Sequence, residues 1–511
     1  MPIKKLMKSI LVLFDEKNKY EDQKVFGGKS ALELCARAAA SLEMPVKTIS
    51  GLSSVGLLLE ELSSICSQSQ SQALVFAFAD CPFLNKALVK ELLTTHFDYK
   101  AEYTFAEGYP QGFAPVVIDK GTLAILLELC KSSAAQQAAA KITRDCIFDL
   151  IKTDINSFEV ETILAPLDWR LYRFAFDCRK KENLIACQRL YQLIEDDEKA
   201  ASLDLFDYSA AALSEVAAKS PEILKTLPAF YNLQLAQKCR GKCSCCPYPQ
   251  ALKKEGLSAE NAEGIMETSR VFALIEQISE YSGEAVIGLS AWGECFNHPD
   301  LLKIIEKLLS YPGLSVFIEA DGNSIPADFA QKAGQLVKNA AESTNGWQKF
   351  MLVISIDAFT AETCRKIRGA DFDLALALEN VKKLEEELPG CIYPQFVRMN
   401  ANESELESFF RYWKEKSNAS AGDFIIQKHN NFAGLLPNEE PADLSPLERN
   451  PCWHVRRDMT ILYNGNVPLC YCRLLDDIQG NVFEEGIEKV WKKIQEDKKC
   501  GGCDEFYTFN F

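Results

Sequence analysis

The stretch YNLQLAQKCRGKCSCCPYP, residues 231–249, runs from an apolar segment directly into four cysteines within eight residues. Three of them, Cys239, Cys243 and Cys246, are spaced C-x3-C-x2-C, so that one irregular loop can direct three thiolates at a common point. Cysteines clustered in this way are candidate metal ligands, and sites made only of thiolates favour zinc or an iron–sulfur cluster. The apolar segment predicts a strand with the cysteine loop at its carboxyl end.

This strand is the first of a repeated pattern between residues 229 and 435. We expect six strands there, at YNLQLA, AVIGLSA, LSVFIEA, FMLVISID, IYPQFVRM and DFIIQ. Amphipathic helices separate them, such as PDLLKIIEKLLSYPG, which Pro299 opens and whose end Gly313 follows. Six strand–helix units predict a parallel sheet in the form of a partial (β/α)6 barrel, similar to a TIM barrel, with its active site at the carboxyl ends of the strands.

Residues 1–195 form a separate α/β region in which the apolar strands SILVLF and ALVFAFA alternate with helical stretches. A linker or helical segment follows at 196–228, and the remaining tail, 436–511, is rich in loops and cysteines. The fold class is therefore α/β, with an amino-terminal α/β domain, a central barrel and a cysteine-rich tail.

Composition and charge exclude several classes of partner. The chain has 511 residues, of which 47% are hydrophobic and 25% charged, with no apolar run long enough to span a bilayer. Its formal net charge of −16 disfavours nucleic acid or an anionic membrane as the main partner. The start of the sequence predicts a first strand rather than a signal peptide, and we expect a cytoplasmic protein whose thiols stay reduced.

The C-x3-C-x2-C loop after the first strand of a partial barrel resembles the radical S-adenosylmethionine (SAM) enzymes. The resemblance implies a 4Fe–4S cluster on Cys239, Cys243 and Cys246 whose fourth iron binds SAM and cleaves it reductively to a 5′-deoxyadenosyl radical. Cys245 stands where the family usually has an aromatic residue, and we interpret it as a bystander. The alternative for this loop is a zinc site or a set of buried thiols.

Three further segments resemble the SAM-binding motifs of that family. LSAWGECFNHPDL is similar to its glycine–glutamate motif, which implies backbone contacts to SAM at Gly293 and Glu294. VISIDAFTAETCRKIRG implies that Ser355 and Arg368 hold the carboxylate and ribose of SAM, and PQFVRM places Gln395 near adenine or substrate. A serine at a strand end is otherwise a helix cap, so each segment is weak alone and the order of all three carries the resemblance.

The tail contains four cysteines with the spacing of a second ligand set: Cys452, Cys470, Cys500 and Cys503. This pattern resembles the auxiliary-cluster domains called SPASM and, in shorter form, twitch, and implies an auxiliary 4Fe–4S cluster. We expect MTILYNGNVPLC to form a hairpin whose Asn464–Gly465 turn brings two ligands together. Cys472 is left as a spare thiol, an exchanged ligand or a substrate contact, and a zinc ribbon is the alternative for the tail.

The amino-terminal region resembles the cytidylyltransferases that activate acidic sugars. FADCPFLNKALVKELL and FAFDCRKKENL imply that Asp80 and Asp177 hold a magnesium ion against a triphosphate. The glycine-containing loop keeps only Gly27, Gly28 and Lys29, however, and nearby acidic residues would repel phosphate. We therefore favour a degenerate domain that binds substrate or a partner, and the three-part chain is similar to the spiro-SPASM proteins.

The function expected from these resemblances is radical modification of a substrate, either a peptide or a sugar-related metabolite, by an enzyme reduced by a flavodoxin or ferredoxin. Catalytic residues are unknown: Glu319 and Asp357 are placed to move protons but are interpreted as caps or loop contacts. His298 and His454 are interpreted as capping or core groups. The alternatives are a sugar nucleotidyltransferase with an accessory iron–sulfur region and a non-catalytic zinc-binding scaffold.

Overall fold

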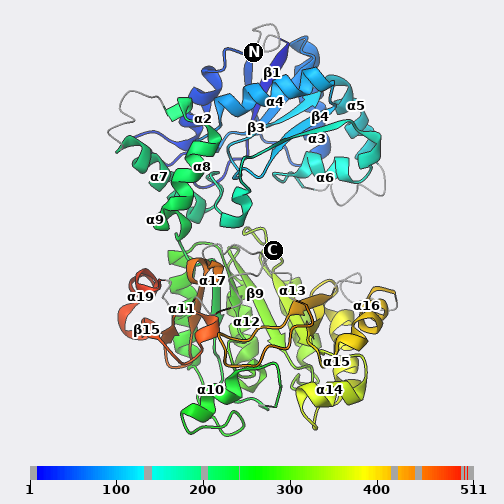
Figure 1. Ribbon diagram of the computed structural model, residues 1–511, viewed down its shortest axis with the longest axis vertical. Helices are drawn as coiled ribbons and strands as arrows, with labels where there is room; N and C mark the ends of the chain where they lie inside the picture. Colours follow the sequence, from blue (N-terminus) through cyan, green and yellow to red (C-terminus); the bar gives the residue numbers. More distant parts are fainter. Residues whose placement is uncertain are drawn as a thin grey trace. The chain divides into compact units, whose positions relative to one another are not determined.

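The chain forms two units, unit 1 (Met1–Thr226) and unit 2 (Leu227–Phe511), each a mixed α/β structure with a largely parallel sheet (Figure 1). The computed structural model describes residues 8–131, 141–196, 205–240, 242–415, 424–442, 452–495, 500 and 503. Within these ranges, no helix has both the length and the apolar character needed to cross a membrane. The finer division of the chain at residues 195, 228 and 435 stays a prediction.

Unit 1 is built on a six-stranded sheet in the order β2-β1-β3-β5-β4-β6. Its strands are β1 (Ser9–Asp15), β2 (Val46–Ser50), β3 (Ala73–Phe78), β4 (Tyr103–Glu107), β5 (Val116–Asp119) and β6 (Val160–Leu164). The central strand β1 pairs in parallel with β2 and β3, and only β5 runs antiparallel to its neighbours. Both strands expected from the sequence are confirmed, as β1 and β3.

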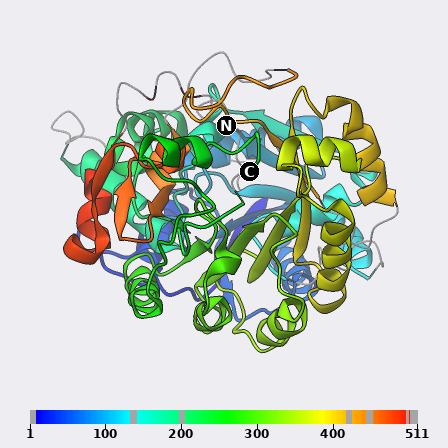
Figure 2. The ribbon, with the colours of Figure 1, turned by 90° about the horizontal axis from the view of Figure 1, so that it is seen from below.

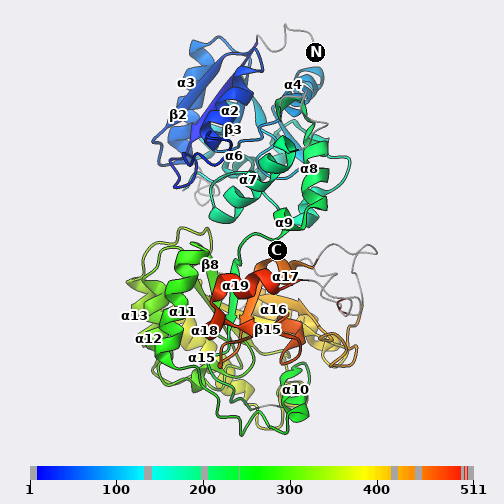
Figure 3. The ribbon, with the colours of Figure 1, turned by 90° about the vertical axis from the view of Figure 1, so that its left-hand side faces the viewer.

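Helices cover both faces of this sheet, because successive side chains along each strand point alternately to one face and to the other. In β1, Leu11 and Leu13 pack with α2 and α4, whereas Val12 and Phe14 pack with α3 and α5 on the other face (Figure 3). The helices of unit 1 are α2 (Ala31–Ala40), α3 (Val55–Gln68), α4 (Lys86–Tyr99), α5 (Lys120–Leu129), α6 (Cys146–Lys152), α7 (Lys181–Glu195), α8 (Ala210–Lys219) and α9 (Pro221–Leu224).

Unit 2 contains a seven-stranded sheet in the order β12-β11-β10-β9-β8-β7-β13, in which every neighbouring pair is parallel. The strands are β7 (Phe230–Leu233), β8 (Ala285–Gly288), β9 (Leu314–Ala320), β10 (Phe350–Ser355), β11 (Ile392–Arg398), β12 (Ile425–Lys428) and β13 (Asp458–Ile461). The six strands expected from the sequence are confirmed as β7 to β12, in sequential order. The seventh comes from the tail.

Most helices of unit 2 pack along the outer side of this sheet (Figure 2), whereas α10 packs with Trp292 and Cys472 in a separate cluster. The helices of unit 2 are α10 (Tyr248–Lys254), α11 (Thr268–Tyr281), α12 (Leu301–Leu309), α13 (Phe329–Lys338), α14 (Ala361–Arg368), α15 (Leu374–Glu387), α16 (Leu406–Glu415), α17 (Trp453–Arg457), α18 (Val482–Glu485) and α19 (Ile487–Lys493). In β9, Val316 and Ile318 belong to the core under the helices, so Glu319 points to the opposite face. One expectation is wrong: α12 begins at Leu301, and Pro299 precedes it.

The hairpin expected in the tail is also wrong in its pairing. β13 pairs in parallel with β7, and β14 (Asn466–Pro468) pairs instead with β15 (Ile478–Asn481). The physical reason is that β13 completes the edge of the sheet beside β7, and this pairing goes with complete burial of Met459 and Ile461. The turn itself forms, and Gly465 is required there, because a Cβ would lie 2.3 Å from the ring of Phe483.

Candidate functional site

A cavity of about 260 Å³ opens in unit 2 at the carboxyl ends of β7 to β12. The cysteine loop after β7, the segment after β8 and the ends of β9 and β10 form its walls. Most of the predicted site residues line it: Cys239, Cys243, Cys246, Gly293, Glu294, Ser355 and Arg368. Residues that are distant in the sequence therefore share one pocket, in the place where parallel βα folds carry their active sites.

Backbone hydrogen bonds hold the cysteine loop at the mouth of this pocket. The Cys239 N–H donates to the Ala259 carbonyl at 2.9 Å, and the Ser244 N–H donates to the Ile367 carbonyl, near the end of α14, at 2.8 Å. The loop between these anchors has no regular secondary structure in its described residues. Cys245 lines the pocket beside the three predicted ligands.

Whether this loop fits a metal cluster depends on the atoms it offers as metal ligands. Three thiols on one short loop line one pocket wall, which is the donor set of an iron–sulfur cluster with an open iron. In the described part of the chain, no three His, Cys, Asp or Glu side chains already converge as a ligand group. Burial raises the pKa of the Cys246 thiol, so deprotonation would accompany metal binding. The donor types and their shared pocket wall fit a three-thiolate site.

Gly293 brings the segment after β8 into direct backbone contact with the chain that leads into the loop. Its φ is +104°, and a Cβ at this position would lie 2.0 Å from the Ala236 carbonyl oxygen. The next residue, Glu294, donates its backbone N–H to the Lys238 carbonyl at 2.9 Å. Burial, with a smaller contribution from the Asp321 carboxylate, raises the pKa of the Glu294 side chain to about 8. No other residue type fits at position 293 without displacing the loop.

A buried ion pair connects the end of α14 to the cysteine loop. The guanidinium of Arg368 pairs with the Asp357 carboxylate and donates to the Cys243 sulfur at 3.6 Å. Asp357 is completely buried, and its Oδ1 also accepts the Val397 N–H at 2.7 Å. Burial raises the pKa of Asp357, and Arg368 opposes that effect. The interpretation of Asp357 as a cap therefore missed its main partner, and Arg368 is a neighbour of a predicted ligand.

Three polar side chains from adjacent strands form a hydrogen-bonded group on the pocket face of the sheet. Glu319 Oε1 accepts from Ser355 Oγ and from Gln395 Nε2, both at 2.8 Å, and Gln395 Nε2 also lies 3.2 Å from Ser355 Oγ. Glu319 and Ser355 line the pocket, whereas Gln395 is not part of its wall. The structure thus ties two predicted residues to Glu319, which the sequence had singled out only as a strand-end carboxylate.

An aromatic stack missed by the sequence analysis joins the pocket to the tail. The rings of Trp292 and Tyr471 lie 4.1 Å apart at an interplanar angle of 15°, and both residues line the pocket. Tyr248 continues the stack at 6.3 Å from Trp292. Trp292 has a φ of +46°, which is unusual for a bulky residue. The sequence features that could have indicated this stack are an aromatic residue directly before the Gly-Glu pair and another directly after Cys470.

The four tail cysteines lie outside the pocket wall and are divided between two neighbouring apolar clusters of unit 2. Cys503 is buried in a cluster with Trp292 and Cys472, against which Cys239, Cys246 and Cys470 pack. Cys452 belongs to the main core of unit 2, with Cys470 and Cys500 packed against it. Burial raises the pKa of Cys452 to about 11, while a hydrogen bond with Cys472 lowers the pKa of Cys470 to about 7. Cys472 therefore packs in the same cluster as Cys503 and is hydrogen-bonded to Cys470, so it is not an isolated thiol.

The two histidines noted beside motifs are held by ordinary structural contacts. His298 is buried, with Nε2 at 2.8 Å from the Met266 carbonyl and Nδ1 accepting the Asp300 N–H at 3.1 Å. His454 lines the pocket, and its Nδ1 lies 2.6 Å from Asp458 Oδ2. The interpretation of His298 as a core group is confirmed.

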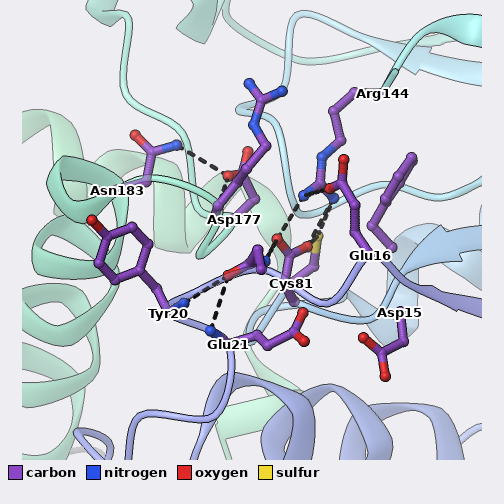
Figure 4. Close-up of polar contacts among 12 residues, drawn as sticks. Asp15, Glu16, Tyr20, Glu21, Cys81, Arg144, Asp177 and Asn183 are labelled. Atoms are coloured by element: carbon purple, nitrogen blue, oxygen red, sulfur yellow. Dashed lines mark hydrogen bonds and ion pairs between the residues drawn. The ribbon is translucent and has the colours of Figure 1, made fainter. Parts of the chain in front are cut away.

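Unit 1 has a separate cluster of charged residues at the carboxyl ends of β1 and β3 (Figure 4). Arg144 donates to both oxygens of Asp80, at 2.8 Å to Oδ1 and 2.6 Å to Oδ2, and lies 3.3 Å from Glu16. Burial alone would lower the pKa of the guanidinium, but Asp80 and Asp177 hold the pKa of Arg144 above its ordinary value. The expected pair Asp80 and Asp177 is present, yet the residues do not fit a magnesium ion, because Arg144 occupies the Asp80 carboxylate.

A further cavity of about 690 Å³ lies beside this cluster in unit 1. The ends of β3 and β4 and helix α6 line it, with an aromatic wall that includes Phe105 and Phe148, whose rings are 4.9 Å apart. Arg144 forms part of the lining as well. The cavity therefore opens onto an arginine.

Comparison with known proteins finds a relative that matches most of this chain. No known family profile matches the sequence. An uncharacterized protein of Treponema pallidum (strain Nichols) is 35% identical over 385 residues, which cover 71% of this chain and 98% of that protein. This chain belongs to the same family. A second uncharacterized protein of the same strain is 29% identical over 84 residues, or 16% of this chain and 38% of that protein.

Several solved structures show distant similarity to this chain. Streptococcus suis SuiB bound to S-adenosylmethionine is 12% identical, with a TM-score of 0.37, and the match covers 67% of this chain and 88% of that chain. BtrN in complex with AdoMet and 2-DOIA is 15% identical, with a TM-score of 0.32 over 54% and 85% of the two chains. A cytidylyltransferase from Leptospira borgpetersenii serovar Hardjo-bovis is 13% identical, with a TM-score of 0.35 over 43% and 97%. These scores are too low to decide fold or activity.

Proposed function

We propose that unit 2 is a radical SAM enzyme core that holds a 4Fe–4S cluster on Cys239, Cys243 and Cys246. The observation that carries the proposal is the shared pocket at the carboxyl ends of the strands, where this loop meets the predicted SAM-binding residues. Three thiolates leave one iron of a cubane cluster without a protein ligand, which is the requirement for binding SAM. When bound and reduced, the cluster supplies the electron that cleaves SAM to methionine and a 5′-deoxyadenosyl radical.

The chain's own residues would bind and orient SAM. The backbone carbonyls around Gly293 and Glu294 accept the ammonium group, and Gly293 keeps that backbone against the loop. Ser355 and Arg368 hold the carboxylate and ribose of SAM. Gln395 does not contact SAM in this arrangement but positions Glu319 and Ser355 through its hydrogen bonds. Arg368 also donates to the Cys243 sulfur, a contact that orients the side chain toward the pocket.

The aromatic stack supports the adenine part of this proposal. The family's usual aromatic residue before the third cysteine is absent here, because Cys245 occupies that position. Tyr471, which stacks on Trp292, supplies aromatic surface in the same pocket, and stacking against a base is a favourable contact for a planar purine. The positive φ of Trp292 indicates that the fold holds its ring in this place at a conformational cost.

The second part of the proposal is that the tail is an auxiliary-cluster domain. Four thiols, Cys452, Cys470, Cys500 and Cys503, would close a second 4Fe–4S cluster and leave no iron open to SAM. Such a cluster relays an electron or braces a tail with little core of its own. The substrate is a peptide or a sugar-related metabolite, modified after hydrogen abstraction, and the electron donor is of the flavodoxin or ferredoxin class.

The proposal is tested by single cysteine variants of the anaerobically reconstituted full chain. Cys239→Ala, Cys243→Ala and Cys246→Ala should each lose SAM binding together with the iron of the pocket cluster. The matched control is Cys245→Ala, which lies in the same loop and pocket and should keep both. If Cys245→Ala loses SAM binding as completely as the others, the assignment of three ligands and one bystander is wrong.

Other outcomes select the competing functions. Zinc at one or two equivalents, with no SAM binding after iron reconstitution, would indicate a metal-binding scaffold. CTP turnover that Asp80→Asn abolishes would indicate a nucleotidyltransferase with an accessory iron–sulfur region.

A further inference from the structure

The guanidinium of Arg144 is built into the place where the carboxylates of unit 1 converge. Its side chain is only 7% exposed, and its Cζ lies 3.9 Å from the centre of the Phe78 ring. The ring fixes the plane of the guanidinium, and the two Nη groups then meet the two oxygens of Asp80 side by side (Figure 4). A planar fork that matches a carboxylate in this way is specific to arginine.

Several other acceptors of the cluster are also engaged from within the chain, although Asp177 Oδ2 has no hydrogen-bond partner among the described residues. Asn18 donates to Asp80 Oδ2 at 2.9 Å, so this oxygen already has two donors. Asp177 Oδ1 accepts from the Arg179 N–H and from Asn183 Nδ2, both at 3.1 Å. A divalent cation such as Mg²⁺ binds through carboxylate oxygens and tolerates no arginine in that position, because two like charges would share one ligand. The Asp80 carboxylate therefore cannot bind Arg144 and a metal ion at the same time.

The glycine-containing loop of unit 1 gives a second, independent observation. Phe26 and Lys29 exchange backbone hydrogen bonds of 3.0 Å in both directions, around Gly27 and Gly28 with φ of +56° and +81°. Two central residues with positive φ make a tight hairpin turn. The N–H of Ser30 is bonded to Glu33 at 2.9 Å. Three backbone N–H groups of this loop, those of Phe26, Lys29 and Ser30, are therefore already bonded within the chain and do not point at a phosphate.

We infer that the Arg144 guanidinium permanently takes the place of a divalent cation in unit 1, which is therefore a metal-independent unit and not a nucleotidyltransferase. A ligand that enters the neighbouring cavity meets this arginine. Without Arg144, the carboxylates of Glu16, Asp80 and Asp177 would lose the buried cation that offsets their charge. A metal ion would then bind to them in its place.

The test is Mn²⁺ binding by the full chain, with electron paramagnetic resonance counting free Mn²⁺. Wild type should bind no Mn²⁺ at this site at millimolar concentration, with or without CTP, and its binding curve should match that of Asp80→Asn. Arg144→Met removes the charge but keeps an unbranched side chain able to lie on Phe78. It should gain one bound Mn²⁺ per chain, and Arg144→Met/Asp80→Asn should lose it again.

Two results would overturn the inference. One is Mn²⁺ or Mg²⁺-dependent CTP turnover in wild type that Asp80→Asn removes. The other is a folded Arg144→Met variant, verified by circular dichroism and gel filtration, that gains no Mn²⁺. Should Arg144→Met fail to fold, the comparison of wild type with Asp80→Asn decides alone, because an Asp80-dependent metal contradicts the inference and its absence supports it.

Discussion

Replacing Arg368 by methionine should strongly destabilise unit 2, because it strands a buried carboxylate. The Asp357 side chain has no exposed area, and that of Arg368 is only 9% exposed. Removing one partner of a buried pair leaves an uncompensated charge, which typically costs about 3–5 kcal/mol of unfolding free energy. A surface pair gives the matched control: Lys332 on α13 and Asp328 at the N-cap of that helix are both more than half exposed, and Lys332→Met should cost at most about 1 kcal/mol.

The assay is urea unfolding followed by tryptophan fluorescence. Five of the six tryptophans belong to unit 2, so the signal reports mainly on that unit: Trp292, Trp347, Trp413, Trp453 and Trp491. The double variant Arg368→Met/Asp357→Asn should recover most of the loss, since a neutral asparagine needs no counter-charge and its Oδ1 still accepts the Val397 N–H. A single-variant loss near that of Lys332→Met, or no recovery in the double variant, would refute the buried-pair reasoning.

Three further predictions concern the backbone, pH and iron content. Gly293→Ala should abolish SAM binding because its Cβ would lie 2.0 Å from a carbonyl oxygen, whereas Gly256→Ala, also at positive φ but in open space, should keep it. Burial lowers the pKa of His96 from 6.5 to about 4, so unit 1 should lose about 3 kcal/mol of stability as pH falls through that window, and His96→Asn should remove this dependence in acid titrations. Anaerobic reconstitution should give about eight irons per chain, and about four in the Cys500→Ala/Cys503→Ala variant; saturation of wild type at four would remove the tail cluster.

Local sequence patterns correctly predicted β1 and β3 in unit 1 and β7 to β12 in unit 2. Short apolar runs such as those of β1 and β9 are a local property, and the run in β9 already placed Glu319 near a strand end. The pairing of β13 could not be predicted in this way. Its neighbour Tyr463 donates to Gln234, 229 positions earlier, and no local rule chooses the distant edge of β7 over a nearby hairpin partner.

The candidate sites show the same division between local and distant information. The spacing of the cysteines and the Gly-Glu pair predicted one wall of the pocket, because those residues are close in sequence. The contact of Arg144 with Asp80 spans 64 positions, and an isolated arginine in a loop carries no signal of its own. The stack of Trp292 on Tyr471 likewise depends on how the tail packs against the sheet. Side chains that meet only through tertiary packing were missed.

The measurement that tests the central claim most directly is 5′-deoxyadenosine formation by the purified, anaerobically reconstituted full chain supplied with SAM and dithionite. The account predicts product that needs both SAM and the reductant, and that disappears in Cys243→Ala, whose lost thiol is the one that Arg368 contacts. A protein that carries a full complement of iron, binds SAM and still forms no 5′-deoxyadenosine above the variant's level would contradict it.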